Sequence, residues 1–341
     1  HGGDSINLYI VECSCCGTIQ TMGKPVPKHQ SVIRSNSISE EMYKFRKEQF
    51  KDFITTYNLQ KKKILEVGCN QGENLSLFQE LGMHATGLEN NQANVQFART
   101  QNLNVIKGFI AQKDIEREIG RFDAFCSFNV LEHWPKFRVV MRKIHDTLNE
   151  NGLGIVEVPN FDMIWEKRLF SEFISDHIYY FSKKTFQNAL MINGFDVIDI
   201  RPVWHNYILS ARIKKRNKLP LQEFLYEKDS VIKEFNSFFE RNKTKSFAVW
   251  GAGHQSLTLI SITNLSENIS FIVDSSKQKQ DKFSPESHLP IRNPEILNNS
   301  DIDGIIVICG SFSNEVVILI KEKYPKIKDI YMFVDNKIMK V

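Results

Sequence analysis

The stretch Ile64-Leu65-Glu66-Val67-Gly68-Cys69-Asn70-Gln71-Gly72 decides the fold. Its first half is an apolar, strand-like run, and its second half is a glycine-containing loop that opens a helical pattern. Glycine is expected in such a loop because the backbone must turn tightly and approach a ligand closely. A dinucleotide-binding loop would read Gly-x-Gly-x-x-Gly, whereas this loop has Asn70 at the middle glycine and Glu66 before the first. Candidate ligand-binding residues are Glu66, Gly68, Asn70 and Gly72.

Strands and helices alternate outward from this loop. An amphipathic helix is predicted over about 42–57. Further helices are predicted between the strand-like runs that form parallel strands, and one more after the last parallel strand. A turn at Asn151-Gly152 leads into the last of these parallel strands. Separate βαβ units of this kind predict an α/β fold with a mostly parallel sheet. The strand-like runs are residues 63–67, 84–88, 104–107, 123–128 and 153–158, followed by 195–201 and 206–212 as an antiparallel pair.

Further candidates follow the next strands. Glu89 ends the second strand about 20 residues after the loop, where a carboxylate accepts hydrogen bonds from ribose hydroxyls. Phe109 and Asn129 come directly after later strands and are predicted to contact the same ligand.

The acidic residue before the first glycine resembles motif I of class I methyltransferases, which holds a methionine moiety rather than a pyrophosphate. A reversed terminal hairpin is also how such domains end. The resemblance implies a Rossmann-like core, S-adenosyl-L-methionine as cofactor and methyltransferase activity. The plainer alternative is that Glu66 forms a salt bridge at the strand end and Gly72 only starts a helix.

A second, smaller α/β pattern occupies the C-terminal part. A helical stripe over 218–241, broken at Asp229-Ser230, precedes strands at 246–250, 269–273, 304–309 and, last, 329–333. Gly251-Ala252-Gly253, with Ser256 at the third glycine position and Asp274 about 20 residues on, is a weak dinucleotide fingerprint.

The first 30 residues contain half of a zinc ribbon. Cys13 and Cys16, followed by Gly17, have the spacing with which one tight turn presents two thiolates to tetrahedral zinc. The next cysteine is Cys69, so either the second pair lies outside this sequence or no metal binds. The predicted domains are a zinc-ribbon-like remnant (1–30), a cofactor-binding domain (31–213) and a C-terminal α/β domain (214–341).

This three-part layout resembles the sugar C-methyltransferases of deoxysugar biosynthesis over nearly the whole chain. The resemblance implies a nucleotide-linked keto sugar as substrate and catalytic roles for Asp176 and His177. Ile174 and Ser175 stand where that family has Tyr and His, which is a departure from its pattern. The motifs that carry the resemblance are Asn129-x-x-Glu132-His133, Glu157-Val158-Pro159-Asn160, residues 173–182 and residues 249–254.

Methylation of carbon next to a ketone requires a base and stabilisation of the enolate oxygen. We expect His177 to be the base, Asp176 to support it and His133 to donate to the oxyanion. The nucleotide diphosphate is expected between the two α/β halves, with its phosphates against the Gly251–Gly253 turn. The candidate substrate-binding residues are Asn160, Tyr180, Gly251, Gly253 and His254.

Other readings remain open. An alcohol or amine acceptor would need the same His177 but no enolate, and a protein that only binds ligands would need neither. A nicotinamide-dependent dehydrogenase using the Gly251 loop is a fourth hypothesis. Independently of the hypothesis chosen, the plainer alternatives are that Asp176-His177 is a helix cap near a bend, that His133 is a structural imidazole and that Tyr180 is part of the core or pocket wall.

Composition excludes several classes of protein. The 341 residues carry 44 basic and 40 acidic side chains, a net charge of +4 without a concentrated basic face, so nucleic-acid binding is not expected. No apolar run approaches the ~20 residues of a membrane span, and no secretory signal pattern is present. The six cysteines do not form a disulfide framework, which predicts a cytoplasmic enzyme with a small-molecule substrate.

Overall fold

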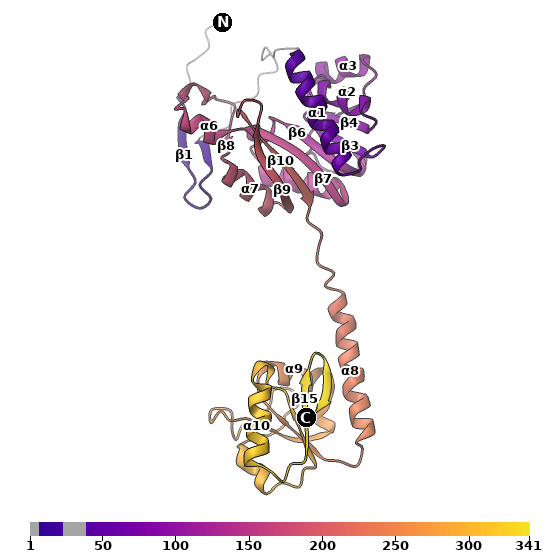
Figure 1. Cartoon of the computed structure of the whole chain (residues 1–341), viewed down its shortest axis with the longest axis vertical. Helices are drawn as coiled ribbons and strands as arrows, with labels where there is room; N and C mark the ends of the chain where they lie inside the picture. Colours follow the sequence, from indigo (N-terminus) through magenta and orange to yellow (C-terminus); the bar gives the residue numbers. More distant parts are fainter. Residues whose placement is uncertain (1–6, 23–38) are drawn as a thin grey trace. The chain divides into compact units, whose positions relative to one another are not determined.

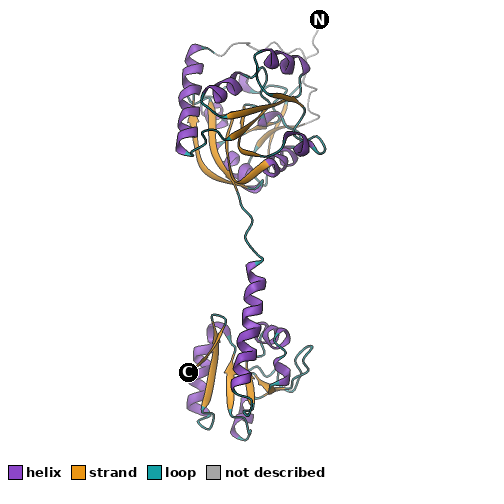
Figure 2. Ribbon diagram, turned by 90° about the vertical axis from the view of Figure 1, so that its right-hand side faces the viewer, coloured by secondary structure: helices purple, strands orange, loops and turns teal. Residues whose placement is uncertain are grey.

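The computed structural model describes residues 7–22 and 39–341. The chain divides into two compact units, His1–Lys218 and Leu219–Val341, which Figures 1 and 2 show in two views. The division falls a few residues beyond the predicted limit at 213.

A seven-stranded sheet forms the first unit, in the order β5-β4-β3-β6-β7-β10-β9. The five strands from β5 to β7 run parallel, and β10 lies antiparallel between β7 and β9. The predicted Rossmann-like core with its reversed terminal hairpin is confirmed. The strands are β3 (Lys63–Val67), β4 (His84–Glu89), β5 (Val105–Lys107), β6 (Phe122–Phe128), β7 (Leu148–Pro159), β9 (Phe195–Val203) and β10 (Ile208–Lys215).

Apolar side chains hold helices against both faces of this sheet. Phe50 and Phe53 of the first helix pack with Phe78 on one face, and Phe186 and Phe195 lie in the core on the other. Each such ring contributes roughly 1.5–3 kcal/mol by leaving water. The helices are α1 (Glu40–Thr56), α2 (Glu73–Glu80), α3 (Gln92–Thr100), α4 (Ile115–Ile119), α5 (Phe137–Thr147), α6 (Phe161–Glu166) and α7 (Lys183–Ile192), with 3-10 turns η1 (Leu131–His133) and η2 (Phe170–Glu172).

A small antiparallel sheet attaches the N-terminal hairpin to this unit. Strands β1 (Tyr9–Glu12) and β2 (Ile19–Met22) form the hairpin, and β2 pairs with β8 (Tyr179–Tyr180). The described part of the predicted 1–30 segment is therefore bonded to the chain segment that carries His177.

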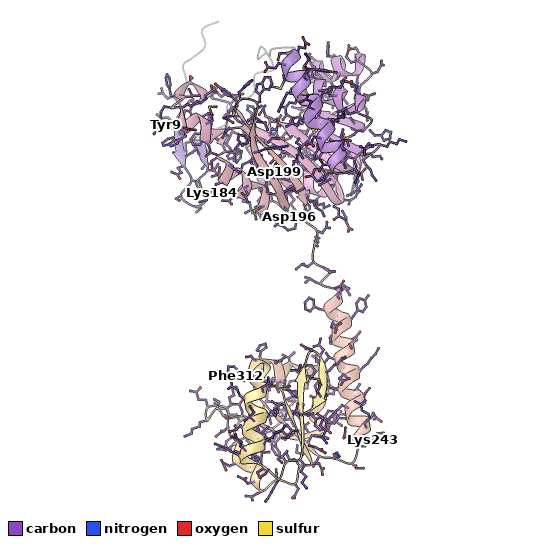
Figure 3. The ribbon with its side chains drawn as sticks, in the orientation of Figure 1. Tyr9, Lys184, Asp196, Asp199, Lys243 and Phe312 are labelled. Atoms are coloured by element: carbon purple, nitrogen blue, oxygen red, sulfur yellow. The ribbon has the colours of Figure 1, made fainter. Side chains whose placement is uncertain are left out.

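The second unit contains a six-stranded sheet in the order β13-β12-β11-β14-β15-β16. Two clusters of buried apolar side chains lie in this unit, one containing Phe235 and Phe247, the other Trp250 and Ile320. Exposed apolar side chains include Phe312 of η5, labelled in Figure 3. Its elements are α8 (Glu223–Arg241), β11 (Phe247–Trp250), α9 (His254–Ile262), η3 (Leu265–Glu267), β12 (Ile269–Val273), β13 (Ile291–Arg292), η4 (Pro294–Asn298), β14 (Gly304–Val307), η5 (Gly310–Phe312), α10 (Ser313–Lys323), β15 (Asp329–Val334) and β16 (Lys337–Lys340).

Three sequence predictions are wrong in detail. Helix α8 runs through Asp229-Ser230 without a break, because both are exposed positions where a weak helix former costs only a few tenths of a kcal/mol. Strand β15 is not the last, since Asp335-Asn336, both with positive φ, turn the chain into β16. Strand β7 begins at Leu148, before the predicted turn at Asn151.

Within the described residues, no helix is both long enough and apolar enough to span a bilayer. All six cysteines are free.

Candidate functional site

The loop between β3 and α2 lies at the carboxyl edge of the first sheet. Gly68, Asn70 and Gly72 all have positive φ, of 77°, 51° and 91°. The φ of 91° at Gly72 requires glycine, whereas a Cβ there would meet, at 2.4 Å, only Cδ1 at the flexible end of the Leu103 side chain. The amide of Gly68 donates to the carbonyl of Leu88, which ties the loop to the end of β4.

Glu89 closes this loop from the end of β4. One carboxylate oxygen accepts from the amide of Asn70 at 3.0 Å, and the other accepts from the amide of Asn91 at 2.7 Å. Each carboxylate oxygen can accept more than one hydrogen bond. Glu89 therefore shapes the loop and keeps acceptor capacity for a ligand's hydroxyl groups.

Glu66 is buried beneath the loop. Its Oε1 accepts from Nδ2 of Asn74 at 3.2 Å, while its Oε2 has no partner among the described residues. Burial raises the pKa of this carboxyl to about 8. No ion pair of Glu66 occurs in the described part of the chain, contrary to the plainer reading of this residue. A buried acceptor of this kind is costly unless a ligand or water uses it.

Asn129 and Phe109 lie at the ends of two other strands. Asn129 has a φ of 52°, its amide donates to the carbonyl of Glu157 at 3.0 Å, and its buried Oδ1 has no partner within the described residues. Phe109 is 39% exposed and follows β5. The carboxyl edge therefore carries two buried amide or carboxylate oxygens and one accessible ring.

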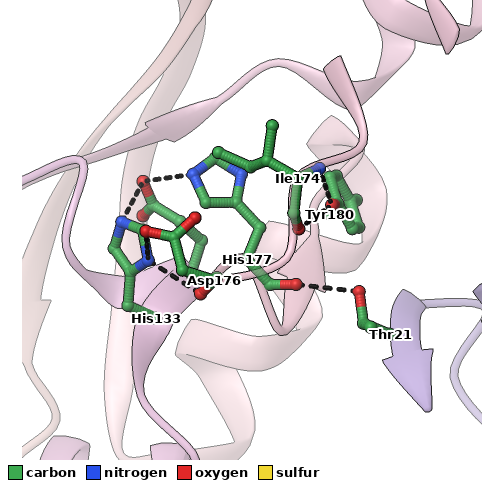
Figure 4. A network of polar contacts seen from close by, with 7 residues as sticks. Thr21, His133, Ile174, Asp176, His177 and Tyr180 are labelled. Atoms are coloured by element: carbon green, nitrogen blue, oxygen red, sulfur yellow. Dashed lines mark hydrogen bonds and ion pairs between the residues drawn. The ribbon is translucent and has the colours of Figure 1, made fainter. Parts of the chain in front are cut away.

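Glu132, His133 and His177 converge just beyond β6 (Figure 4). Oε1 of the buried Glu132 lies 3.7 Å from Nε2 of His133 and 3.9 Å from Nε2 of His177. The two imidazoles meet edge to face with centroids 4.7 Å apart. Nδ1 of His133 lies 2.9 Å from the carbonyl oxygen of Asp176 and 3.5 Å from its carboxylate. Thus the three predicted catalytic residues lie together, around a carboxylate that was not among the candidates.

The segment that carries His177 is braced from two sides. Thr21 of β2 donates its hydroxyl to the carbonyl of His177 at 2.8 Å, and the amide of Ile178 donates to the carbonyl of Glu132. The hydroxyl of Tyr180 exchanges hydrogen bonds with the backbone of Ile174. The residues at 174–178 form a loop rather than the helix start that the plainer reading of Asp176-His177 requires.

The side chains of Asn160 and Tyr180 make hydrogen bonds to the protein's own backbone. Asn160 caps α6 with its side-chain oxygen and donates from Nδ2 to the carbonyl of Asn206. Tyr180 is 2% exposed, and burial raises the pKa of its phenol. These side chains position the loops around the histidines and have little surface left for a ligand.

Sequence reasoning missed a buried ion pair behind the site. Arg46 of α1 donates to Oε2 of Glu157 at 2.5 Å, and Gln49 donates to Oε1 at 2.6 Å. The carbonyl of the same Glu157 holds the amide of Asn129. A charged residue inside the apolar stripe of α1 was the available signal, because a buried Arg requires a buried partner.

In the second unit, the backbone conformation and the surroundings require glycine at position 251 but not at position 253. Gly251 has a φ of 120°, and a Cβ there would lie 2.5 Å from the carbonyl oxygen of Ile308. Gly253 has a φ of −85° and open space beside it, and it precedes α9 with the exposed His254 at the first helical position. Ser256 is fully buried. Asp274 accepts from the amides of Ala252 and Ser276.

The cysteine turn of residues 13–17 places Cys13 and Cys16 close together in the chain. Backbone N–H groups of Cys16 and Cys15 lower the pKa of the Cys13 thiol, which favours the thiolate that zinc needs. Among described residues, the only His, Cys and acidic groups that converge as three ligands are Glu132, His133 and His177.

A surface cavity of about 630 Å³ lies away from these residues. It is lined by Lys63, His84 and Phe122, at the amino ends of β3, β4 and β6. The carboxyl edge is where ligands bind in sheets of this type.

Comparison with known families agrees with this geometry. Residues 40–200 match the model of a methyltransferase domain, and residues 214–326 match the model of the C-methyltransferase C-terminal domain. The chain is an S-adenosylmethionine-dependent methyltransferase. The two matches fall one in each structural unit of the methyltransferase, so the predicted enzyme class is confirmed.

Individual relatives of the methyltransferase are distant. The C-methyltransferase NovU of Streptomyces niveus is 23% identical over 284 residues, which are 74% of this chain and 68% of that protein. An S-adenosylmethionine-dependent methyltransferase from Clostridium acetobutylicum superposes with a TM-score of 0.44 at 13% identity, covering 55% of this chain and 95% of the other. The magnesium protoporphyrin IX methyltransferase of Synechocystis, solved with S-adenosylhomocysteine, superposes with a TM-score of 0.40 at 15% sequence identity. The superposition covers 53% of this chain and 90% of the other.

Proposed function

We propose that this methyltransferase methylates a carbon atom next to a keto group in a nucleotide-linked sugar. The observation that carries the proposal is the pair of histidines, His133 and His177, at the carboxyl edge that also bears the glycine loop. The match of residues 214–326 to a C-terminal domain of C-methyltransferases supports carbon as the acceptor.

The residues of the loop suit S-adenosylmethionine. Glu89 would bind the ribose hydroxyls through its remaining acceptor capacity. Oε2 of Glu66 and Oδ1 of Asn129, which have no hydrogen-bond partner among the described residues, would accept from a donor such as the methionine ammonium. Gly68 and Gly72 allow close approach of the backbone, Asn70 shapes the turn, and Phe109 offers an apolar wall to the adenine. The bound cofactor supplies a methyl group on a positive sulfur that leaves as a neutral sulfide.

His177 would act as the base. Its Nε2 takes the proton from the carbon next to the ketone, and the electron pair passes to the enolate oxygen. The carbonyl of Asp176 can only accept, so the facing Nδ1 of His133 carries a hydrogen. His133 would therefore stabilise the enolate oxygen from Nε2 when this nitrogen also carries a hydrogen, in the imidazolium form.

The second unit would hold the nucleotide diphosphate. Gly253 leaves space beside the first turn of the nine-residue helix α9, whose free amides attract phosphate. Gly251 fixes the turn, and His254 adds an exposed donor. Asn160 and Tyr180 would affect the substrate only through the loops that they hold.

Ile174 and Ser175, in place of the family's Tyr and His, favour a second candidate function, which is O- or N-methylation of another small molecule. Zinc at Cys13 and Cys16 would need two further ligands from outside the described turn.

The test uses the full chain with S-adenosylmethionine and a panel of keto-sugar nucleotides. We expect a product heavier by one CH2 unit, with the new methyl group on carbon by NMR. In D2O without cofactor, the hydrogen next to the ketone should exchange. His177→Asn should abolish exchange and transfer while S-adenosylhomocysteine still binds, and the exposed His84→Asn should change neither. Products methylated only on oxygen or nitrogen, or no sugar product from the whole panel, would overturn the proposal.

A further inference from the structure

Three potential metal ligands meet at one point in the first unit. Oε1 of Glu132 lies within 4 Å of Nε2 of both His133 and His177, and all three donor atoms lie within 4.8 Å of one another. Glu132 is 1% exposed, and the side chains of the two histidines are 15% and 14% exposed. Two imidazoles and one carboxylate, contributed by η1 and by the loop before β8, thus lie close together and largely buried.

The hydrogen bond of His133 directs its other nitrogen toward that space. Because the carbonyl of Asp176 cannot donate, Nδ1 of His133 carries the hydrogen, and Nε2 of the neutral ring presents a lone pair to Glu132. Histidines that bind metals usually donate their second ring N–H to a carbonyl or carboxylate in this way, which fixes the tautomer. A lone pair facing a carboxylate oxygen at 3.7 Å is stabilised by a positive charge placed between them.

The kind of donor atom selects the kind of cation. Imidazole nitrogen suits zinc, copper, nickel and iron, whereas magnesium and calcium prefer ligands that are all oxygen. With zinc bonds of about 2.0–2.2 Å, ligands of one tetrahedral ion lie roughly 3.3–3.5 Å apart. The distances from Glu132 to the two histidines, 3.7 and 3.9 Å, exceed that spacing by a few tenths of an ångström. The donor atoms of the two histidines lie within 4.8 Å of each other, so the imidazoles need to approach by up to about 1.4 Å when an ion binds.

We propose that Glu132, His133 and His177 bind a divalent transition cation of the zinc class, and that the cation-bound methyltransferase is inactive. The inhibition rests on the proposed function, since a His177 that shares its Nε2 lone pair with a cation cannot take a proton there. The binding site rests on geometry alone. Availability of such cations would then control the enzyme through its own base.

The binding arm of the test uses Co²⁺ and the full chain. One ion per chain should bind with visible d–d absorption, and Glu132→Gln and His177→Gln should each weaken its binding at least about tenfold. A thiolate charge-transfer band would mark binding at Cys13, Cys15 or Cys16, so the titration is repeated with Cys13→Ser, which should keep the d–d signal. Exposed His205→Gln is the matched control and should bind like the parent. Calorimetry with S-adenosylhomocysteine shows that each variant is folded.

Two other results of the Co²⁺ binding experiment would contradict the proposed cation site. Binding that survives both ligand substitutions, or that Cys13→Ser removes, overturns it. Failure of Co²⁺ and Zn²⁺ to bind stoichiometrically would mean that the three side chains share a proton rather than a cation, and it overturns the site as well.

The second arm measures methyl transfer with added Zn²⁺ and then with a chelator. We expect loss of transfer that the chelator reverses, and Zn²⁺-bound protein with undiminished transfer would overturn the inhibition. If no methyl transfer occurs under any condition while Co²⁺ still binds through Glu132 and His177, the proposed function fails and the site stands.

Discussion

The two units build nearly the same turn and use it differently. In the first, the amide of Gly68 donates to the carbonyl of Leu88 and Glu89 collects two backbone amides. In the second, the amide of Gly251 donates to the carbonyl of Val273 and Asp274 collects two backbone amides. The same kinds of bond therefore tie each turn to the end of the adjacent strand.

The two turns differ in the acidic side chains that lie beside them. Asp274 is also paired with Lys279 at 3.2 Å, and the strand position two residues before Gly251 is the buried Val249. The corresponding position in the first unit is Glu66, with a buried oxygen left over in the described structure. We propose that this unused acceptor makes the first turn, and not the second, the cofactor site, and the following predictions test that difference.

The largest effect is expected from the backbone of the turns. Gly251→Ala places a Cβ 2.5 Å from a backbone carbonyl at a φ of 120°, so it should destabilise the second unit by about 3 kcal/mol. Gly72→Ala meets only the flexible end of Leu103 and should cost less. Gly253→Ala, at a φ of −85°, should cost below about 1 kcal/mol.

Peptide-resolved hydrogen exchange measures each unit by itself and so checks all three substitutions. Equal losses of protection in Gly251→Ala and Gly253→Ala would contradict the conformational argument.

The carboxylates at the strand ends should differ in their effect on the cofactor. Glu89→Gln removes a charged acceptor, so calorimetry should show S-adenosylhomocysteine binding weakened about 10- to 100-fold. Asp274→Asn should leave this affinity unchanged, because its carboxylate belongs to the second unit and is already paired with Lys279. Loss of affinity in Asp274→Asn with none in Glu89→Gln would reverse the assignment of the two turns.

Glu66 should make the stability of the first unit depend on pH. Burial raises its pKa to about 8, so the folded chain holds a proton that the unfolded chain releases above the ordinary pKa of a glutamate, 4.5. The stabilisation is present below that value and is lost as pH rises toward 8, by at most about 1.4 kcal/mol per pH unit.

Glu66→Gln keeps the shape and removes this dependence. Unfolding of the parent and the variant, measured at several pH values from 5 to about 9, should give curves that diverge as pH rises, with the variant more stable at the alkaline end. Parallel curves would mean that Glu66 is not buried as a neutral acid.

Much of the first unit follows from local pattern. The strand 63–67 is predicted to the residue, since an apolar run and a glycine loop leave little choice of structure. The positive φ values at Gly68 and Gly72 likewise follow from the residue type that permits them. Strand β16 and the continuous helix α8 were missed because packing of Phe235 and Phe239 outweighs weak local signals.

The sequence by itself determined the enzyme class, the turn at Gly68 and the chemistry available to Glu66, Glu89, His133 and His177. Only the tertiary structure decided which of these side chains meet. Glu132 and His177 are far apart along the chain, and they come together because the loop before β8 is held between β2 and the segment after β6. Contacts of this kind depend on the summed packing of distant segments, which no local spacing in the sequence encodes.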